Sequence, residues 1–275
     1  MMNTLLLTTI LTLALSSLLA TGASGEVPAQ PDRSYDHGSI TLANNNSTYG
    51  YRLLRPEEQK TPAPLVIFLH GAGERGSNNR SQLNYLPKRF LDAPHLRNKR
   101  CYVLAMQCPR NEQWAPYRGL IGKQNAPLPA MQALMQAARR VMRDENIDPA
   151  RIYLTGLSMG GYGSWDLAAR HPEWFAAVVP ICGGGKTRTA ERLKDVPIWA
   201  FHGTADKVVP EQQSRRMIDA IRRAGGTPAY SPLPGVGHGS WQMAYGPGGA
   251  MEWMFAQKNP DPEAVEAISM PSNTN

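Results

Sequence analysis

The sequence predicts an α/β fold in which a mostly parallel central sheet is flanked by helices. Continuous apolar runs of strand length alternate along the chain with stretches of helical periodicity, and such alternation is typical of α/β domains. The apolar runs show no apolar–polar alternation, which indicates strands that are buried on both faces. With 275 residues, 42% hydrophobic and 19% charged, the chain fits one globular domain.

The strands are expected in a definite order. Residues 39–54 predict two antiparallel strands around an Asn-rich turn. A proline-interrupted segment, 227–235, predicts a weaker last strand. The buried strands between them are expected in 64–71, 101–109, 151–156, 176–184 and 197–203.

Helices are expected between these strands. Residues 128–142 carry apolar side chains, among them three methionines, at helical spacing, so we interpret the methionines as core rather than as metal ligands. Residues 209–224 predict a second helix, with Pro210 near its start and Gly225 and Gly226 as its stop. A third follows Ser158 and ends before His171 and Pro172.

The two ends of the chain differ in composition from the predicted domain. Residues 1–25 resemble a secretory signal peptide, with an apolar run from Leu5 to Ala20 and small residues after it. No Lys or Arg precedes that run, so an uncleaved anchor stays an alternative. We expect a flexible lead-in over 26–38, the folded domain over 39–257 and a loosely held polar tail over 258–275. The expected location is secreted or periplasmic, without stable membrane association after cleavage.

Charge and cysteine content limit the possible functions. The net charge of +7 comes from scattered Lys and Arg residues, and no basic run is interleaved with aromatic residues, so we expect no nucleic-acid partner. Cys101 and Cys108 bracket a predicted strand, which would hold them about 23 Å apart, too far for a disulfide. Pairing of Cys182 with either stays open. The spacing of Cys and His suggests no metal site, and no cofactor is expected.

The most informative motif is G-x-S-x-G at residues 156–160, between a predicted strand and a predicted helix. A serine at so sharp a turn is forced into a strained backbone conformation, so the residues two before and two after it must be nearly free of side chain. The turn exposes Oγ, and the helix that follows points its N-terminus toward the reacting atoms. Ser158 is therefore the candidate nucleophile.

A serine hydroxyl needs a histidine base, and the base needs a carboxylate to fix its tautomer. Catalytic groups in α/β sheets collect beyond the carboxyl ends of the strands. Asp206 follows the predicted strand 197–203, and His238 follows the last weak strand. For two other histidines a structural role is preferred over a role in proton transfer. His70 is interpreted as a residue that shapes its loop, and His202 as a residue packed in the interior.

Four segments, "HGAGERG", "GLSMGGYGSW", "HGTADKVVP" and "GHGSW", resemble the α/β-hydrolase superfamily, in particular secreted bacterial phospholipase/carboxylesterase-like, feruloyl esterase-like and polyhydroxybutyrate-depolymerase-like enzymes. The resemblance covers about residues 39 to 256. It implies an α/β-hydrolase fold with Ser158 as nucleophile, His238 as base and Asp206 as the orienting acid, in the order of that fold.

The same resemblance implies an oxyanion hole and a substrate pocket. The backbone N–H groups of Met159 and Ala72 are the expected oxyanion donors, with Gly71 and Gly73 as alternatives to Ala72. Related enzymes often have an aromatic residue at the position of Trp114, which would line that pocket. Independently of the resemblance, Glu74 is a candidate for holding a polar substrate group, and Gly71 would let the backbone approach the substrate closely. A structural role for Trp114, and an ion pair between Glu74 and Arg75, are the alternatives.

The spacing also bears on the substrate. Only about 13 residues, "GGGKTRTAERLKD", separate the strands 176–184 and 197–203, which leaves no room for a cap domain. The sequence thus predicts a serine esterase for small soluble or polymer-linked esters. A peptidase or acyltransferase with the same three residues, and a non-enzymatic binding module on this fold, are the alternatives. The oligomeric state is not predicted.

Overall fold

The computed structural model describes residues 34–116 and 126–269, all of them within one compact unit of the chain. Its strands are β1 Tyr35–Thr41, β2 Thr48–Leu54, β3 Ala63–Leu69, β4 Tyr102–Met106, β5 Ile147–Leu157, β6 Ala177–Ile181, β7 Trp199–Gly203 and β8 Ala229–Leu233. Its α-helices are α1 Leu86–Asp92, α2 Pro94–Arg97, α3 Pro129–Asp144, α4 Met159–Arg170, α5 Gln212–Arg223, α6 Trp241–Ala244, α7 Ala250–Ala256 and α8 Glu263–Ser269. The described residues also form the 3₁₀ helices η1 Ala72–Glu74, η2 Ser81–Leu83, η3 Pro172–Trp174 and η4 Thr187–Leu193.

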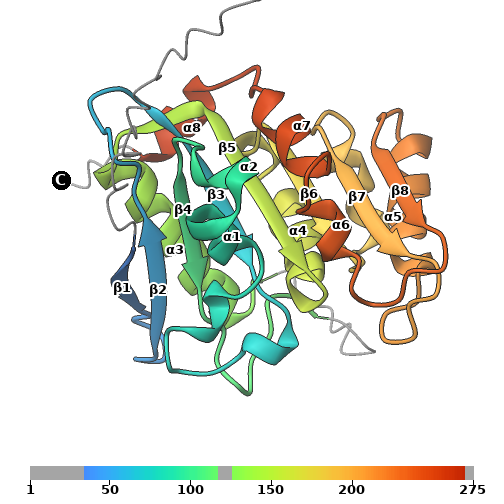
Figure 1. Cartoon of the computed structure of the whole chain (residues 1–275), viewed down its shortest axis with the longest axis horizontal. Coiled ribbons are helices and arrows are strands. Elements are labelled where there is room, and N and C mark those ends of the chain that lie inside the picture. The colour runs from blue at the N-terminus through green and yellow to red at the C-terminus, as the bar shows by residue number, and fades with distance from the viewer. Residues whose placement is uncertain (1–33, 117–125, 270–275) are drawn as a thin grey trace, which may run out of the picture. The chain divides into compact units, whose positions relative to one another are not determined.

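The strands form one eight-stranded sheet in the order β1-β2-β4-β3-β5-β6-β7-β8 (Figure 1). The strand β2 pairs antiparallel with both β1 and β4, whereas all pairs from β4 to β8 are parallel. The mostly parallel sheet expected from the sequence is therefore confirmed.

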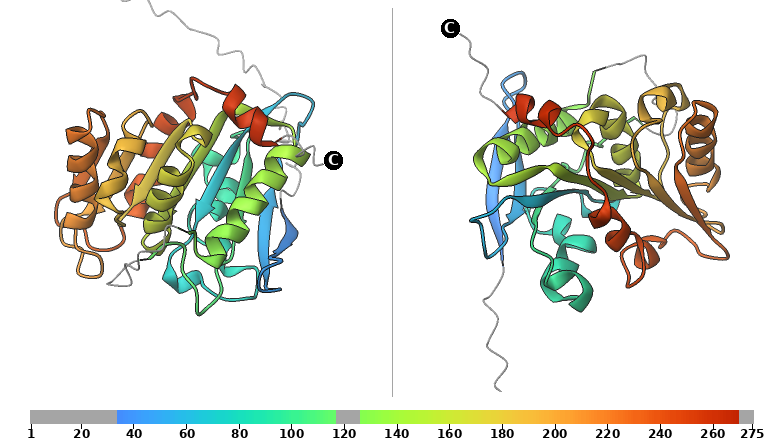
Figure 2. Two further views of the ribbon diagram at one scale, coloured as in Figure 1. Left: turned by 180° about the vertical axis from the view of Figure 1, so that it is seen from behind. Right: turned by 90° about the horizontal axis from the view of Figure 1, so that it is seen from above.

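Helices cover both faces of the sheet (Figure 2). The helices α3, α4, α5 and α8 bury apolar side chains against one face, and α1, α2, α6 and α7 bury theirs against the other. The central strands β3, β4 and β6 are buried along their whole length. This double burial explains why their sequences lack the alternation of a half-exposed strand.

The register of the sheet brings the carboxyl ends of four strands together. Leu69 at the end of β3 pairs with Gly156 near the end of β5, and Leu157 pairs with Ile181 at the end of β6. Ile181 in turn pairs with Phe201 of β7. The segments that follow these strands therefore lie side by side at one edge of the sheet, where α/β proteins place their ligands.

Two expectations about the ends of the domain were wrong. The lead-in predicted over 26–38 ends earlier, because β1 begins at Tyr35, whose ring is buried and whose hydroxyl donates to the carbonyl of Pro87. The tail predicted over 258–275 is not loose along its described part, because α8 buries Val265 in the core and the side chain of Asn259 donates to the carbonyl of Glu173. The predicted signal peptide, 1–25, lies outside the described residues.

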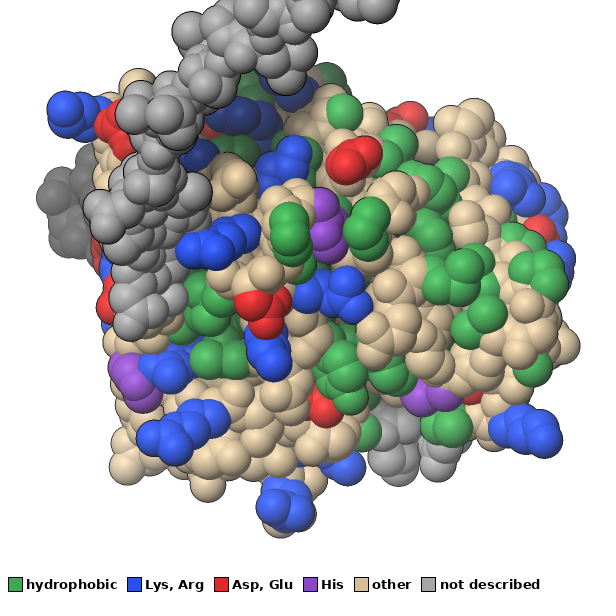
Figure 3. Space-filling view, viewed as in Figure 1, with side chains coloured by type: hydrophobic (Ala, Val, Ile, Leu, Met, Phe, Trp, Pro, Cys, Tyr) green, Lys and Arg blue, Asp and Glu red, His purple; other side chains and the backbone are tan. Residues whose placement is uncertain are grey.

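The connection from β6 to β7 carries only the short η4, so no cap domain is inserted there. In the described part of the chain, no helix combines the length and apolarity needed to cross a bilayer. On the face shown in Figure 3, Lys and Arg side chains are spread out rather than gathered into one run.

Candidate active site

Ser158 lies at the turn between β5 and α4. Its backbone has φ 54° and ψ −116°, a conformation that a residue with a side chain rarely adopts. A hydrogen bond to the neighbouring strand β6 stabilises the turn: the Ser158 N–H donates to the carbonyl of Ile181 at 2.9 Å. A strained serine fixed in this way presents its hydroxyl above the edge of the sheet.

The glycines on either side of Ser158 are required by close backbone approach. A Cβ atom added to Gly160 would lie 1.9 Å from the carbonyl oxygen of Leu69, and one added to Gly156 would lie 2.5 Å from that of Gly160. The G-x-S-x-G spacing is thus explained by contact between the start of α4 and the ends of β3 and β5.

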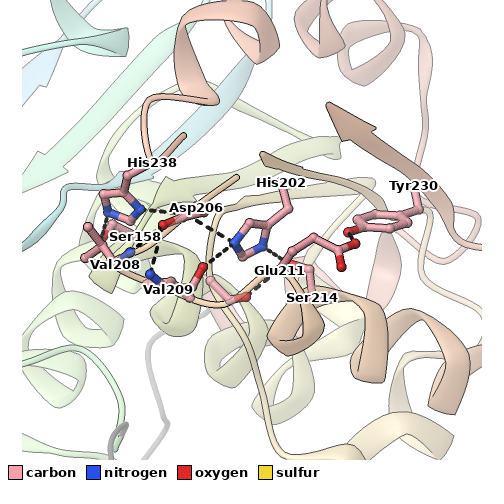
Figure 4. Close-up of polar contacts among 10 residues, drawn as sticks. Ser158, His202, Asp206, Val208, Val209, Glu211, Ser214, Tyr230 and His238 are labelled. Atoms are coloured by element: carbon pink, nitrogen blue, oxygen red, sulfur yellow. Dashed lines mark hydrogen bonds and ion pairs between the residues drawn. The ribbon is translucent and has the colours of Figure 1, made fainter. Parts of the chain in front are cut away.

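Two loops bring the other polar groups to the serine (Figure 4). Asp206 follows β7, and His238 lies in the loop between β8 and α6. His238 Nε2 lies 2.9 Å from Ser158 Oγ, and His238 Nδ1 lies 2.7 Å from Asp206 Oδ2. This chain of hydrogen bonds joins residues that are 80 and 32 positions apart in the sequence.

The environment of Asp206 keeps its carboxyl group ionised. Burial by itself raises the pKa of Asp206, but hydrogen bonds from His238 and from the backbone of Val209 and Val208 outweigh burial and lower that pKa below its usual range. The N–H groups of Val208 and Val209 donate to Oδ1 at 2.8 and 2.9 Å, which leaves Oδ2 for the histidine. The carboxylate is therefore both charged and fixed in orientation.

A second histidine contacts Asp206, and no local sequence pattern indicates this contact. His202 is fully buried at the end of β7, with Nε2 2.9 Å from the carbonyl oxygen of Val209 and 3.3 Å from Asp206 Oδ2. Both neighbours of Nε2 are hydrogen-bond acceptors, so Nε2 carries the proton, and Nδ1 lies 2.8 Å from the hydroxyl of Ser214. Burial lowers the pKa of His202, which keeps the ring neutral near pH 7.

Cys182 follows β6 beside this group. Its backbone has φ 39°. Cys182 is buried, as are Cys101 and Cys108, and none of the three forms a disulfide within the described residues. Burial raises the pKa of Cys182 to about 12, so the sulfur stays a neutral thiol. Cys182, Asp206 and His238 offer metal-ligand atoms within 4.8 Å of one another, but both ring nitrogens of His238 already face Ser158 and Asp206.

The expected oxyanion donors both begin a helix at this edge of the sheet. Met159 is the first residue of α4, and Ala72 is the first residue of η1, just beyond β3. The two turns touch, because a Cβ on Gly160 would also lie 2.8 Å from the carbonyl oxygen of His70. Their role as donors stays a prediction.

His70 shapes the loop after β3, as the sequence indicated. Its Nδ1 lies 2.6 Å from the carbonyl oxygen of Gly71, and its Nε2 accepts a hydrogen bond from the N–H of Cys108 at 2.9 Å. Burial lowers the pKa of His70 to about 4, and the neutral ring with its proton on Nδ1 satisfies both contacts.

The expected substrate-binding role of Trp114 does not fit its position. Trp114 is fully buried, its indole N–H donates to the carbonyl of His70 at 3.1 Å, and its ring packs edge-on against the His70 ring. A ring without accessible surface cannot line an open pocket, so the structural alternative is correct.

The loop residues Gly71, Glu74 and Arg75 also differ from expectation. Glu74 is buried and accepts a hydrogen bond from the backbone of Gly71, and burial raises its pKa. Arg75 donates instead to the carbonyls of Ala72 and Glu112, and no ion pair joins it to Glu74 in the described residues. Gly71 is packed against Leu157. Glu74 and Gly71 thus stabilise the loop from within rather than facing solvent.

Trp241 stabilises the position of His238. The two rings meet edge-on with their centroids 5.4 Å apart, and Trp241 in turn packs edge-on against Tyr85.

The fold and this arrangement of side chains define an α/β-hydrolase. Residues 117–246 match the model of the dienelactone hydrolase family. A solved structure described as a thermostable esterase is 37% identical with a TM-score of 0.75, and the alignment covers 82% of this chain and 63% of that one. A ferulic acid esterase structure, 16% identical with a TM-score of 0.56 over 86% of this chain and 99% of that one, shares the fold.

Two curated relatives are similar to the chain over part of their length. The chain is 33% identical over 91 residues to a bifunctional acetylxylan esterase/xylanase of Neocallimastix patriciarum, covering 33% of this chain and 14% of the relative. It is 26% identical over 137 residues to poly(3-hydroxyalkanoate) depolymerase C of Paucimonas lemoignei, covering 47% and 30%. The chain therefore spans less than a third of the length of these relatives.

Proposed function

We propose that this protein is an exported serine esterase that cleaves carboxylic esters through an acyl-enzyme intermediate. The observation that carries the proposal is the chain of hydrogen bonds from Ser158 through His238 to a charged Asp206, with the serine in a strained turn. The similarity to esterases supports the ester class, and the apolar run at the N-terminus supports export.

In this mechanism Ser158 Oγ attacks the ester carbonyl while His238 Nε2 takes the hydroxyl proton. Asp206 accepts the Nδ1 hydrogen and stabilises the imidazolium as it forms. The N–H groups of Met159 and Ala72 would bind the oxyanion. The imidazolium then gives its proton to the leaving alcohol, and a water molecule repeats the sequence on the acyl-enzyme to release the acid and free Ser158.

The connection between β6 and β7 supports an uncapped site, which suits small soluble esters or ester groups attached to a polymer. Acyl transfer to an acceptor other than water, and peptide cleavage, would use the same three residues. Product analysis with an added alcohol distinguishes transfer from hydrolysis, and matched ester and amide substrates distinguish the esterase from the peptidase.

The decisive experiment replaces the nucleophile. Ser158→Ala should lower kcat on p-nitrophenyl acetate by roughly 10³- to 10⁶-fold, since only binding and the oxyanion donors are left. A fluorophosphonate probe should label the unaltered protein at Ser158 and leave the variant unlabelled. Unimpaired turnover by the folded variant would refute the proposal.

A further inference from the structure

A cavity of about 500 Å³ lies between α4, the β6–β7 connection and the start of α5. We refer to it as the α4–α5 pocket. Its apolar wall includes Trp165, Ala169, Val209 and Pro210, and at its mouth Val208 is 51% exposed. A cavity of this volume is large enough for a small organic group.

The pocket adjoins the candidate active site through the backbone. Tyr162, which lines the pocket, lies one helical turn beyond Ser158, and its N–H donates to the Ser158 carbonyl at 3.1 Å. On another wall, Val208 and Val209 hold Asp206 with their N–H groups (Figure 4). The residues that line the pocket thus include direct neighbours of Ser158 and Asp206.

The charge of the pocket is unbalanced. Lys186, Arg188 and Arg216 line it, and none of them forms an ion pair with an acidic side chain among the residues that the structure describes. The lining carboxylate of Asp166 is already neutralised by Arg170, with Nε 2.6 Å from Oδ2. The pocket thus combines apolar walls with cations that form no ion pair within the described part of the chain.

Such a lining suits a ligand with an apolar stem and an anionic end. Burial of the stem against the apolar wall contributes the hydrophobic part of binding. A carboxylate at the far end would find partners in the cations, above all in the two guanidinium groups, whose planar donors match a carboxylate. A neutral ester of the same length would leave the cations without partners.

We propose that the α4–α5 pocket selects esters that carry a carboxylate several bonds away from the scissile carbonyl. The proposal rests on the esterase function proposed above and adds a substrate class to it. The carboxylate could belong to the acyl part or to the alcohol part of the ester, and the chemistry of recognition is the same in both.

The test measures a preference for charge. The acyl arm compares the p-nitrophenyl monoester of adipic acid with its methyl-capped neutral counterpart. The alcohol arm compares the butyrate ester of 4-hydroxybenzoate with that of methyl 4-hydroxybenzoate. The unaltered protein should show the higher kcat/KM for the anionic member in one arm, and added NaCl should reduce that preference by screening.

The double variant Arg188→Gln, Arg216→Gln should lower the ratio of anionic to neutral kcat/KM roughly tenfold, because each charge pair with an exposed arginine contributes up to about a fivefold effect. Arg223→Gln is the matched control: it removes one cation from the last turn of α5, outside the pocket lining, and should leave the ratio unchanged.

The outcomes are distinguishable. No preference for the anionic ester in either arm, or a preference that survives the double variant, overturns the selection of carboxylates while the hydrolysis of neutral esters still stands. Failure to cleave any of the four esters would count against the esterase function itself.

Discussion

His202 Nε2 lies 3.3 Å from Asp206 Oδ2, the same oxygen that lies 2.7 Å from His238 Nδ1. One carboxylate oxygen therefore faces two imidazole rings, one fully buried and one near the serine. The buried His202 ring contacts the carboxylate on the side opposite His238 (Figure 4). His202 Nδ1 lies 2.8 Å from the Ser214 hydroxyl, which helps to orient the ring.

Replacing His202 should change the pH dependence of the reaction as well as stability. In His202→Gln the carboxylate loses a neighbouring donor and keeps more of its negative charge for His238. The acidic limb of kcat/KM should therefore move to higher pH, and kcat should fall by about tenfold, as expected for a disturbed general base. Ser214→Ala removes the hydroxyl beside His202 Nδ1 and beside the Gly183 carbonyl but leaves the contact between His202 and Asp206, so it should shift the profile less. If His202→Gln is less stable but its pH profile is unchanged, His202 contributes to packing and not to the orientation of Asp206.

The choice of Asp206 as the acid is tested against Asp195. Asp206→Asn should retain the fold but lower kcat by about 10⁴-fold, because an amide facing His238 favours the wrong tautomer. Asp195 is exposed and precedes β7, at the opposite edge of the sheet, so Asp195→Asn should leave kcat nearly unchanged. Circular dichroism on both variants verifies folding. The reverse ranking would show that the acid has been misassigned.

Because of His70, the free energy of unfolding should decrease as the pH falls below about 6.5. Its pKa is lowered to about 4 in the folded protein by burial, whereas an unfolded histidine has a pKa of about 6.5. Above pH 6.5 both states are neutral and the contribution is complete. Between pH 6.5 and 4 only the unfolded chain takes up the proton, so about 3 kcal/mol of stability is lost as the pH falls.

The measurement is the free energy of unfolding in urea at pH 8 and pH 5. His70→Gln should lower that free energy at pH 8, because the contact with Gly71 is lost, and should flatten the change between the two pH values. Asp206 titrates at lower pH because its folded pKa is lowered, so it contributes little to this window. An equally steep pH dependence in the variant would rule His70 out as the source.

Gly160→Ala tests two opposing effects on stability, the higher helix propensity of alanine and the clash of its Cβ atom with β3. Alanine inside a helix is favoured over glycine by about 1 kcal/mol, but here its Cβ would lie 1.9 Å from the carbonyl oxygen of Leu69. We expect the clash to dominate and the variant to unfold at a urea concentration well below that of the unaltered protein. Gly73→Ala, which has nothing within 4 Å of the added carbon, is the control and should be tolerated. A stabilised Gly160→Ala would contradict the tight contact between α4 and β3.

Local patterns in the sequence were sufficient for the type and order of most elements. The apolar runs identify β3, β4, β6 and β7 because strands covered on both faces need apolar residues throughout. The glycines around Ser158 identify the turn, because only glycine fits where α4 approaches the backbone of β3. The order of Ser158, Asp206 and His238 along the chain also follows from where each strand ends.

Only the tertiary structure determined the roles of residues that depend on contacts between segments far apart in the sequence. Burial of Trp114 against His70, the packing of Glu74 on its own loop and the second imidazole at Asp206 all arise from neighbours that no local pattern encodes. The same holds for α8, which lies in a polar segment of the chain but buries Val265 in the core. The grouping of Lys186, Arg188 and Arg216 around one cavity likewise appears only when the β6–β7 connection folds against α5. Sequence spacing determines which side of a strand or helix a residue occupies, but only the packed chain determines which charges face one another.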